Sequence, residues 1–336
     1  MATSFTQKLI NVAVKLANNP GTNQPNTFAE GSVPGQSSGA NSVTISNSRT
    51  SVRIYNSGSF VENKATIKIW GLTPSLMNQL NTLGIVYNIV PKNTVTVTAG
   101  DAVNGMTTVF SGTIQWCAGD YEAMPDVPLI FECNNLLANA IAPVPAKSFT
   151  GPTDVAQIMQ GFATQSGMGF QNGGVSIKLP APYFSGTAKE QMQKCADWAG
   201  IYVGEIGGTI WIWPKGGSRG NSGPASATTP IISRATGMIA APVFGPQGII
   251  IKTLFNPAIS RGGLIQVQSA VLTGVLSAQS SANPNFKAPS NNVWAVNKLD
   301  HALDSLVRNG QWMSTVHAYN PNSPKPIPKP IPPATG

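Results

Sequence analysis

Residues 65–76 read ATIKIWGLTPSL, and within this stretch one sequence pattern gives way to another. The apolar residues at positions 65, 67 and 69 alternate with other residues, and a period of two indicates a β-strand. Thr73 followed by Pro74 then predicts a helix with Thr73 as its N-cap, and we expect Gly84 to end it. A strand followed by a short helix is therefore expected within the first folded region.

The N-terminal fifty residues are expected to form a helix and a flexible arm, together spanning 1–50. Phe5, Leu9, Val12 and Leu16 would share one helical face, so residues 3–17 predict an amphipathic helix. Residues 18–51 are rich in Asn, Gly, Pro and Ser, a composition typical of flexible or extended chain.

Alternating apolar residues predict several further strands on both sides of a mixed segment. Expected strands near 52–54, 65–69, 93–99, 107–117 and 127–134 make residues 51–145 a first β-domain. In the middle, helices at 154–165, capped by Thr153, and at 187–199, ended by Gly200, are each followed by strands. The last of these strands, 201–206 and 209–213, are joined at Gly207-Gly208, a strong hairpin signal. Residues 150–215 therefore predict a small α+β insertion domain.

A Gly/Ser/Pro-rich linker at 214–230 leads to a second β-domain at 231–320. Its expected strands lie at 248–255, 263–272, 292–300 and 311–319. The terminal residues 321–336 are rich in proline and predict a polyproline II tail, with plain disorder as the alternative.

The two β-regions share a weak pattern. IKIW at 67–70 followed by LTPSL at 72–76 is similar to IIIK at 249–252 followed by FNPAI at 255–259. A second pair of strands around a loop recurs in each region as well. We interpret this as an internal duplication, with chance similarity between Gly- and Pro-rich strands as the alternative.

Charge is distributed very unevenly along the chain. Only 10% of the residues are charged, the formal net charge is +8, and residues 206–299 contain no acidic residue. Most protein surfaces mix both signs, so such a segment indicates a surface completed by another subunit, an acidic partner or a nucleic acid. The candidate interface or channel residues are Lys215, Arg219, Arg234, Lys252, Arg261, Lys287 and Lys298.

The candidates for chemistry are weak, and we expect no catalytic, cofactor-binding or metal site. The serine-hydrolase pattern at 35–39 lies in low-complexity sequence, although that motif works only at a strand-to-helix turn. His301 and His317 lie on neighbouring expected strands, with Asp300 and Asp304 beside His301, and a hydrogen-bonded strand histidine is the simpler interpretation.

Two other sets of residues have functional alternatives. Asp120 and Glu122 have the spacing of a possible glycosidase pair, but a solvated turn explains them more simply. Trp211 and Trp213 precede Lys215 and Arg219, as aromatic and basic residues do in single-strand binders. Two tryptophans at a strand period of two usually belong to a core, so we expect only loose contact with passing DNA.

Compartment signals point to a reducing cytoplasm as the place of synthesis and assembly. Three cysteines, Cys117, Cys133 and Cys195, cannot form a disulfide framework. No apolar run is long enough to span a membrane, and the N-terminus has no secretory h-region.

The order of several short passages resembles the hub proteins of contractile phage-tail baseplates, a group that includes the T4 hub, the P2 and Mu late-control-type proteins and the N-terminal part of type VI spike proteins. The passages are IKIWGLTP at 67–74, FSGTI at 110–114, the helix at 187–199 with the hairpin around Gly207-Gly208, and WAVNKLDH at 294–301 with QWMST at 311–315. Together they cover most of residues 50–320.

The resemblance implies a mainly β protein with two tube-type β-barrel domains flanking a small α+β domain. It further implies a homotrimer that joins the hexameric tail tube to the trimeric central spike around a channel for DNA, within the virion tail baseplate. Tape measure and wedge proteins are further expected partners. The alternatives are a tail-tube or tail-completion protein that forms hexamers, a tail-associated glycosidase, and a secreted carbohydrate-binding β-protein.

Overall fold

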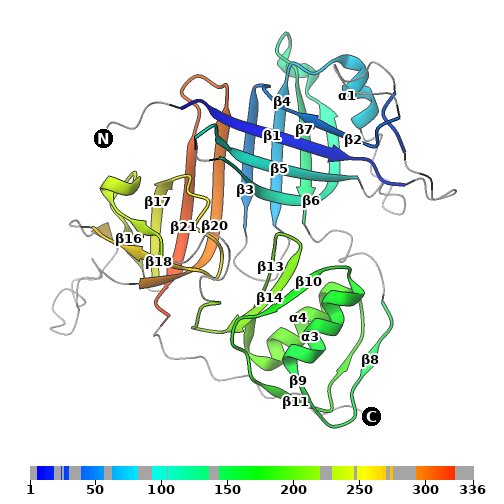
Figure 1. The fold of residues 1–336 in the computed structure, drawn as a ribbon, viewed down its shortest axis with the longest axis vertical. Coiled ribbons are helices and arrows are strands. Elements are labelled where there is room, and N and C mark those ends of the chain that lie inside the picture. The colour runs from blue at the N-terminus through cyan, green and yellow to red at the C-terminus, as the bar shows by residue number, and fades with distance from the viewer. Residues whose placement is uncertain are drawn as a thin grey trace. The chain divides into compact units, whose positions relative to one another are not determined.

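The computed structural model describes residues 6–18, 24, 26–29, 39–56, 63–81, 93–103, 105–135, 144–219, 229–245, 248–269, 273–274 and 293–321. The chain is mainly β, with three short α-helices among these residues (Figure 1). It forms two compact units. Unit 1 comprises Met1–Tyr55, Glu62–Ala138 and His301–Trp312, and unit 2 comprises Asn56–Val61, Asn139–Asp300 and Met313–Gly336.

Unit 1 is built on one strongly bent antiparallel sheet. Its strand order is β2-β1-β5-β6-β7-β4-β3, and residues His301–Ser305 of strand β20 then pair with β3. Figure 1 shows β1 and β5 crossing β3, β4 and β7 at a steep angle. The strands are β1 (Lys8–Lys15), β2 (Ser42–Ile45), β3 (Thr50–Tyr55), β4 (Lys64–Trp70), β5 (Thr94–Asp101), β6 (Gly105–Gly119) and β7 (Pro128–Asn134).

Strand β6 makes the bend because it pairs with strands of both parts of the sheet, the part with β1 and β5 and the part with β7, β4 and β3. Residues 105–113 pair with β5, whereas residues 113–119 pair with β7. The register shifts once in each ladder, between Val97 and Thr98 and between Ile114 and Trp116. Bulges of this kind increase the local twist of a strand, so one long strand can turn from one layer into the other.

The N-terminal helix predicted for residues 3–17 is wrong, since this segment forms strand β1. Ile10, Val12 and Val14 are all buried, and β1 pairs with β5 over its full length. Val14 lies off the helical face that contains Phe5 and Leu16, but it fits a strand period of two. The apolar residues of this segment fit a helix as well as a strand, and backbone pairing with the edge of β5 favours the strand. Part of the expected arm also forms a strand, β2, which pairs with β1.

A side-chain hydrogen bond connects β20, the last strand of the unit 1 order, to β1, which lies next to the strand at the other end. The hydroxyl of Ser305, in β20, donates to the carbonyl oxygen of Lys8 at 2.8 Å. The ammonium group of Lys8 in turn lies 2.8 Å from the buried carboxylate of Asp101. The sheet is thus curved far enough for its last strand to contact β1.

The short helix α1 (Pro74–Leu80) confirms the predicted helix start. The side chain of Thr73 accepts a hydrogen bond from the Leu76 backbone N–H at 3.3 Å. Leu76 and Met77 are buried. The expected end at Gly84 lies outside the described residues, and the last helical residue is Leu80.

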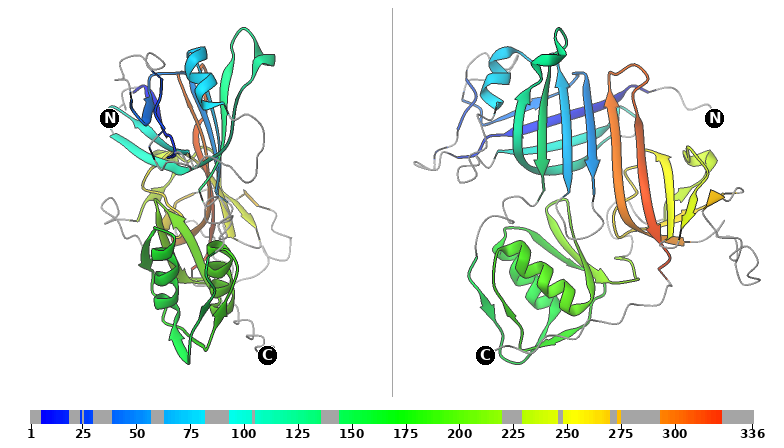
Figure 2. Two further views of the ribbon diagram at one scale, coloured as in Figure 1. Left: turned by 90° about the vertical axis from the view of Figure 1, so that its right-hand side faces the viewer. Right: turned by 180° about the vertical axis from the view of Figure 1, so that it is seen from behind.

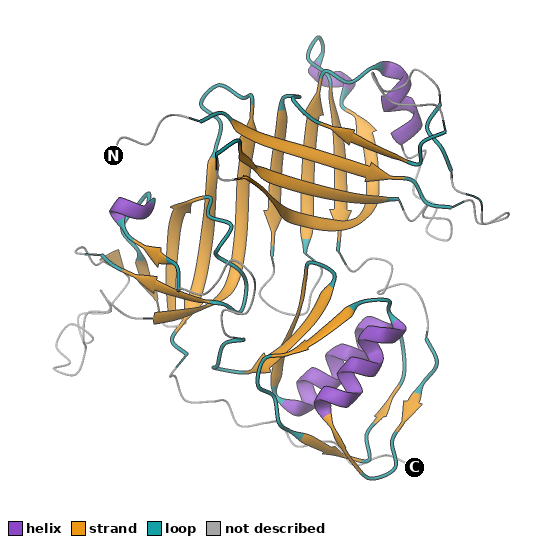
Figure 3. Ribbon diagram, viewed as in Figure 1, coloured by secondary structure: helices purple, strands orange, loops and turns teal. Residues whose placement is uncertain are grey.

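Unit 2 contains the predicted α+β region. Helices α3 (Val155–Gln165) and α4 (Ala188–Ala199) pack on a three-stranded sheet of order β10-β14-β13 (Figure 3). Its strands are β10 (Gly169–Asn172), β13 (Ile201–Ile206) and β14 (Thr209–Pro214), with short strands β8 (Lys147–Ser148), β9 (Pro152–Asp154), β11 (Lys178–Pro180) and β12 (Tyr183–Phe184) beside them.

The helix caps in this region match the sequence signals with one exception. The predicted N-cap Thr153 is wrong, because Asp154 accepts the hydrogen bond from the Ala156 N–H at 2.8 Å. Thr187 and Glu190 form a reciprocal capping box at the start of α4, and Gly200 ends that helix in the left-handed conformation, with a φ of 63°.

The remaining strands of unit 2 surround a second apolar core. This core includes Ile249, Ile251, Ile265, Val296 and Val316. The strands are β15 (Ile231–Ile232), β16 (Val243–Gly245), β17 (Gly248–Leu254), β18 (Leu264–Val267), β19 (Thr273–Gly274), β20 (Val293–Ser305, divided between the units at Asp300) and β21 (Trp312–Tyr319). Four of these strands confirm the predictions near 248–255, 263–272, 292–300 and 311–319.

The strand pairing supports an internal duplication. In unit 1 the order is β3-β4-β7-β6-β5, and in unit 2 the order is β16-β17-β21-β20, with β18 pairing next to β20. Taken in chain order, β3, β4, β5, β6 and β7 correspond one to one with β16, β17, β18, β20 and β21. The same five-strand pairing pattern therefore occurs twice, as Figures 1 and 2 allow the reader to follow.

The strand assignment of the N-terminus predicts which side chains carry stability. Val14→Ala is expected to lower the free energy of unfolding by about 2 kcal/mol, because it removes buried methyl groups. Lys15→Ala, at an exposed position, is expected to change it by less than about 0.5 kcal/mol. Urea denaturation of both variants measures the difference. A larger loss from Leu16→Ala than from Val14→Ala would contradict the strand and favour the helical face.

Candidate assembly surfaces

The seven basic residues of the acid-free segment do not form one surface. Arg219 and Arg261 are buried, whereas Arg234 and Lys252 are exposed. Lys215 and Lys298 are half-buried, and Lys287 lies outside the described residues. Lys298 is neutralised by Asp300 at 2.9 Å. Sequence position therefore groups residues that have very different surroundings.

Arg261 lies inside unit 2, between the α+β region and the second β-region. Its guanidinium donates to the carbonyl oxygens of Val203, at 3.3 Å, and Asn297, at 3.2 Å. It also lies over the ring of Trp213, 5.6 Å from the centroid. Burial lowers the pKa of Arg261 to about 10, while Tyr319, Tyr202 and Glu205 act in the opposite direction. The side chain is therefore still charged at neutral pH.

Arg219 continues this cluster. Its Nε donates to the carbonyl oxygen of Arg261 at 2.7 Å, and its Nη2 donates to the hydroxyl of Ser260 at 2.5 Å. The guanidinium lies over the ring of Trp211, 4.6 Å from the centroid. Burial lowers the pKa of Arg219 as well. Both arginines are thus held by carbonyl groups and aromatic rings of the same unit.

Three aromatic residues complete the contact. The ring of Tyr202 lies 5.9 Å from those of both Trp213 and Tyr319. The Tyr319 hydroxyl donates to the carbonyl oxygen of Gly217, and burial raises its pKa to about 12. Trp213 belongs to the core, with 2% of its surface exposed. The arginine–aromatic cluster, meaning Tyr202, Trp213, Arg219, Arg261 and Tyr319, joins β13 and β14 to β21 within unit 2.

The cluster predicts unequal effects of two arginine substitutions. Arg261→Ala is expected to lower the free energy of unfolding by about 3 kcal/mol, because it leaves two buried carbonyls and an aromatic face without their partner. Arg234→Ala, at an exposed position, is expected to cost less than about 0.5 kcal/mol. Urea denaturation compares the two variants. Equal losses would contradict a structural role for Arg261.

The residues around His301 form an ion-pair network of unit 1. Arg53 contacts both carboxylate oxygens of Asp304, at 2.7 and 3.1 Å, and the Ser51 hydroxyl donates to the same carboxylate at 2.7 Å. The backbone N–H of Gln311 donates to it at 2.8 Å. Burial alone would raise the pKa of Asp304, but the hydrogen bonds from Arg53, Ser51 and Gln311 outweigh burial and lower it. Asp304 therefore acts as a structural anion.

The other members of that group are also engaged within the chain. Asp300 contacts Lys298 and accepts a hydrogen bond from the Asn56 N–H at 3.0 Å. Burial and the charge of Lys298 lower the pKa of His317, while Asp300 raises it. Among the described residues, no group of three or more His, Cys, Asp or Glu side chains has the arrangement that holds a metal ion.

Asp304 predicts a pH-dependent contribution to stability. Asp304→Asn is expected to lower the free energy of unfolding by about 2 kcal/mol near neutral pH. Because the folded-state pKa is lower than the unfolded one, this contribution is present above the ordinary Asp pKa of about 4 and is lost as the pH falls through the folded-state value. Urea denaturation of both proteins at neutral and acidic pH measures the gap.

The exposed ion pair between Asp126 and Arg49 provides the control. Asp126→Asn is expected to cost less than about 1 kcal/mol at any pH, because water screens an exposed pair. A gap for Asp304→Asn that stays constant down to acidic pH would contradict the assigned role of its carboxylate.

Asp120 and Glu122 lie in the turn of the β6–β7 hairpin. Asp120 precedes a 3-10 helix of residues Tyr121–Ala123, which contains Glu122, and residues 121–126 are all exposed. Figures 1 and 2 show this turn projecting beside α1. The predicted solvated turn is confirmed by this exposure.

The three cysteines are buried and none of them forms a disulfide. Cys117 and Cys133 lie on the paired strands β6 and β7, and Cys195 lies in α4. Burial raises the pKa of Cys117 and of Cys195 to about 12, and it also raises that of Cys133. None of the helices within the described ranges could span a bilayer. The hydrolase-like pattern at 35–39 and the proline-rich tail at 321–336 fall almost entirely outside the described residues.

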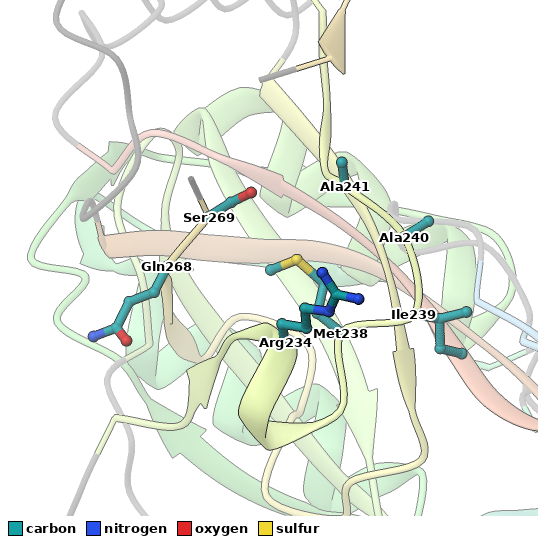
Figure 4. Close-up of a pocket in the computed structure, with 7 residues that line it drawn as sticks. All are labelled: Arg234, Met238, Ile239, Ala240, Ala241, Gln268 and Ser269. Carbon is teal, nitrogen blue, oxygen red and sulfur yellow. The ribbon is translucent and has the colours of Figure 1, made fainter. Parts of the chain in front are cut away.

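One pocket of unit 2 has a volume of about 330 Å³. It is lined by Arg234 from the 3-10 helix η2 (Arg234–Thr236), by residues 238–241, and by Gln268 and Ser269 after β18. Figure 4 shows the side chains of Arg234 and Met238 between residues 239–241 on one side and Gln268 and Ser269 on the other. One signal for this region is visible in the sequence: the run of Ile249, Ile250 and Ile251 interrupts the alternation and places an apolar side chain on the outer face of β17.

A sequence profile described as baseplate hub gp41 matches residues 36–276, more than half of the chain. The chain belongs to this baseplate hub family. It is therefore a structural component of a phage or prophage tail baseplate, and the predicted family is confirmed. No curated protein sequence matches it significantly.

Solved structures of phage tail proteins share the fold at very low sequence identity. The 43 kDa tail protein of prophage MuSo2 from Shewanella oneidensis is 8% identical, with a TM-score of 0.53, over 93% of this chain and 98% of that one. A tail protein from Neisseria meningitidis MC58 is 10% identical, with a TM-score of 0.52, over 92% and 96%.

A third structure links the fold to secretion machinery. The Escherichia coli c3393 protein, described as a type VI secretion component with structural similarity to the T4 tail proteins gp27 and gp5, is 8% identical to this chain. Its TM-score is 0.51, over 85% of this chain and 79% of that one. At these identities the likeness establishes the fold alone.

Proposed function

We propose that this chain is the hub of a contractile tail baseplate and works as a homotrimer. Each chain contributes two tube-type β-barrels, one from each β-region, so three chains place six barrels around a central channel. Six similar units match the hexameric tail tube on one face of the ring. The threefold arrangement of whole chains receives the trimeric central spike on the other face.

The observation that carries this proposal is the repeated strand order of the two β-regions. A ring of three chains can imitate sixfold symmetry only if each chain presents two equivalent elements. The five strands β3 to β7 and the five strands β16, β17, β18, β20 and β21 pair in the same order. Membership of the baseplate hub family supports the same assignment.

The composition is consistent with a subunit whose sides are covered by neighbours. Only 10% of the residues are charged, and a free surface with so few charges would promote association. Partners on the two faces are the tail tube protein and the central spike, with tape measure and wedge proteins as further contacts. The hub assembles in the host cytoplasm and remains in the virion.

The basic residues outside the buried cluster supply the electrostatic part of the proposal. Lys215, Arg234 and Lys252 contact acidic surfaces of partners, or make non-specific contact with DNA that passes through the channel. Lys298 already pairs with Asp300, and Lys287, which lies outside the described residues, is a candidate from the sequence alone. Arg219 and Arg261 act inside unit 2 instead. The hub performs its role mechanically, by shape and symmetry.

Native mass spectrometry tests the copy number directly. We expect the purified protein, alone or with its spike, to have three times the chain mass of 35.1 kDa. Six copies would favour the alternative of a tail-tube or tail-completion ring, and a monomer at all concentrations, with or without the spike, would contradict both.

A further inference from the structure

The outer face of β17 is an exposed apolar surface with two cations. Ile250, Lys252 and Leu254 point away from the core, in alternation with the buried residues of the strand. Ile239 lies beside them, because its N–H donates to the Lys252 carbonyl at 2.9 Å. Ile239 and Leu254 are 50% and 52% exposed. The set Arg234, Ile239, Ile250, Lys252 and Leu254 is called the β17 outer face below.

This face carries positive charge without compensation. Neither η2 nor the strands β16, β17 and β21 contains an acidic residue. Arg234 and Lys252 form no ion pair with any described residue. Apolar side chains exposed next to unpaired cations are typical of a surface that another protein covers.

The pocket beside Arg234 adds a place for one large side chain. Arg234 and Ile239 belong both to the β17 outer face and to the pocket lining (Figure 4). A volume of about 330 Å³ exceeds the roughly 150 Å³ of a cavity that holds benzene. An aromatic ring in this pocket would lie next to the Arg234 guanidinium, a favourable cation–π arrangement.

The turn of the β6–β7 hairpin has the complementary composition. Residues 93–146 contain no Lys, Arg or His, so this whole region carries only negative charge. Tyr121 and Met124 are 56% and 72% exposed. Asp126 is already paired with Arg49, whereas Asp120 and Glu122 form no ion pair with any described residue. The hairpin turn, defined as Asp120, Tyr121, Glu122 and Met124, thus combines two free carboxylates with two exposed apolar side chains.

We propose that the hairpin turn of one copy docks on the β17 outer face of a second copy. Asp120 and Glu122 then face Arg234 and Lys252, and Tyr121 or Met124 enters the pocket beside Arg234. The hairpin turn and the β17 outer face are different surfaces, so the contact between copies is head-to-tail. Such a contact repeats from copy to copy until a ring closes. This inference rests on the proposed trimer and names the surfaces that build it.

Charge reversal tests the contact. The turn variant carries Asp120→Lys and Glu122→Lys, and the face variant carries Arg234→Glu and Lys252→Glu. Each is expected to weaken self-association about 100-fold or more, since like charges then oppose each other in the contact. The variant with all four substitutions restores opposite charges and is expected to associate like the wild type. Native mass spectrometry over a concentration series measures each protein.

A matched control separates this contact from a general effect of net charge. Lys178→Glu with Arg308→Glu changes the net charge as the face variant does, at exposed positions elsewhere. This control is expected to associate normally. All substituted positions of the face variant and of the control are exposed. A circular dichroism spectrum like that of the wild type and a cooperative thermal transition show that a variant is folded, whereas the midpoint itself falls when association is lost.

Mixing the two single-surface variants distinguishes contact between copies from contact within a chain. A turn variant and a face variant have complementary surfaces, whereas two copies of the same variant repel each other. A ring of three must place two copies of one variant side by side, so it always contains one repulsive contact. The equimolar mixture is therefore expected to give complexes of one turn variant and one face variant. A mixture that stays monomeric would overturn docking between copies.

The outcomes separate this inference from the proposed function. Wild-type trimers that persist in both reversed variants would overturn the docking and leave the trimeric hub intact. The wild type could instead associate in a copy number other than three. If each reversal then abolished this association and the fourfold variant restored it, the docking would be supported and the trimer overturned. Failure of the fourfold variant to associate, although folded, would also overturn the docking.

Discussion

The pairing of strand β1 with β5 is the interaction on which unit 1 depends. A strand edge that is not paired exposes a row of backbone donors and acceptors, and β1 satisfies that of β5 over eight residues. The same strand pairs with β2, and the Ser305 hydroxyl reaches its Lys8 carbonyl from β20. Without β1, the curved sheet would have an open edge on the side opposite β3. The N-terminal segment is therefore part of the sheet and not an appendage.

Unit 2 uses a different device to join its two parts. Arg219 and Arg261 are buried, and burial of a charge costs free energy unless other groups solvate it. Carbonyl oxygens and the faces of Trp211 and Trp213 take that role. Because these groups come from both the α+β region and the strands after it, the arginines stabilise only the docked arrangement. Burying them makes that arrangement specific.

The chain's unusual charge distribution has two separate causes. Part of the basic excess between residues 206 and 299 is internal, in the arginine–aromatic cluster. Arg234 and Lys252 instead lie at the surface, next to exposed apolar side chains of β17, and the proposed docking gives them a negative counterpart in the region around Asp120 and Glu122. A building block that must associate with itself and with unlike neighbours gains orientation from such complementary charges, while apolar contacts supply most of the free energy.

Local sequence was sufficient for most elements of the fold. Alternation located β4, β5, β6, β7, β17 and β21, and the cap residues Thr73 and Thr187 located helix starts, because both signals depend on neighbouring residues alone. Residues 8–15 could not be assigned in this way, since their apolar residues fit a strand and a helix, and the edge of β5 decided between them. The burial of Arg261, the joining of Trp213 to Tyr319 and the exposure of Ile250 and Tyr121 likewise followed only from the tertiary structure. A sequence pattern determines which face of an element is apolar, but what covers that face is determined by segments that are distant along the chain.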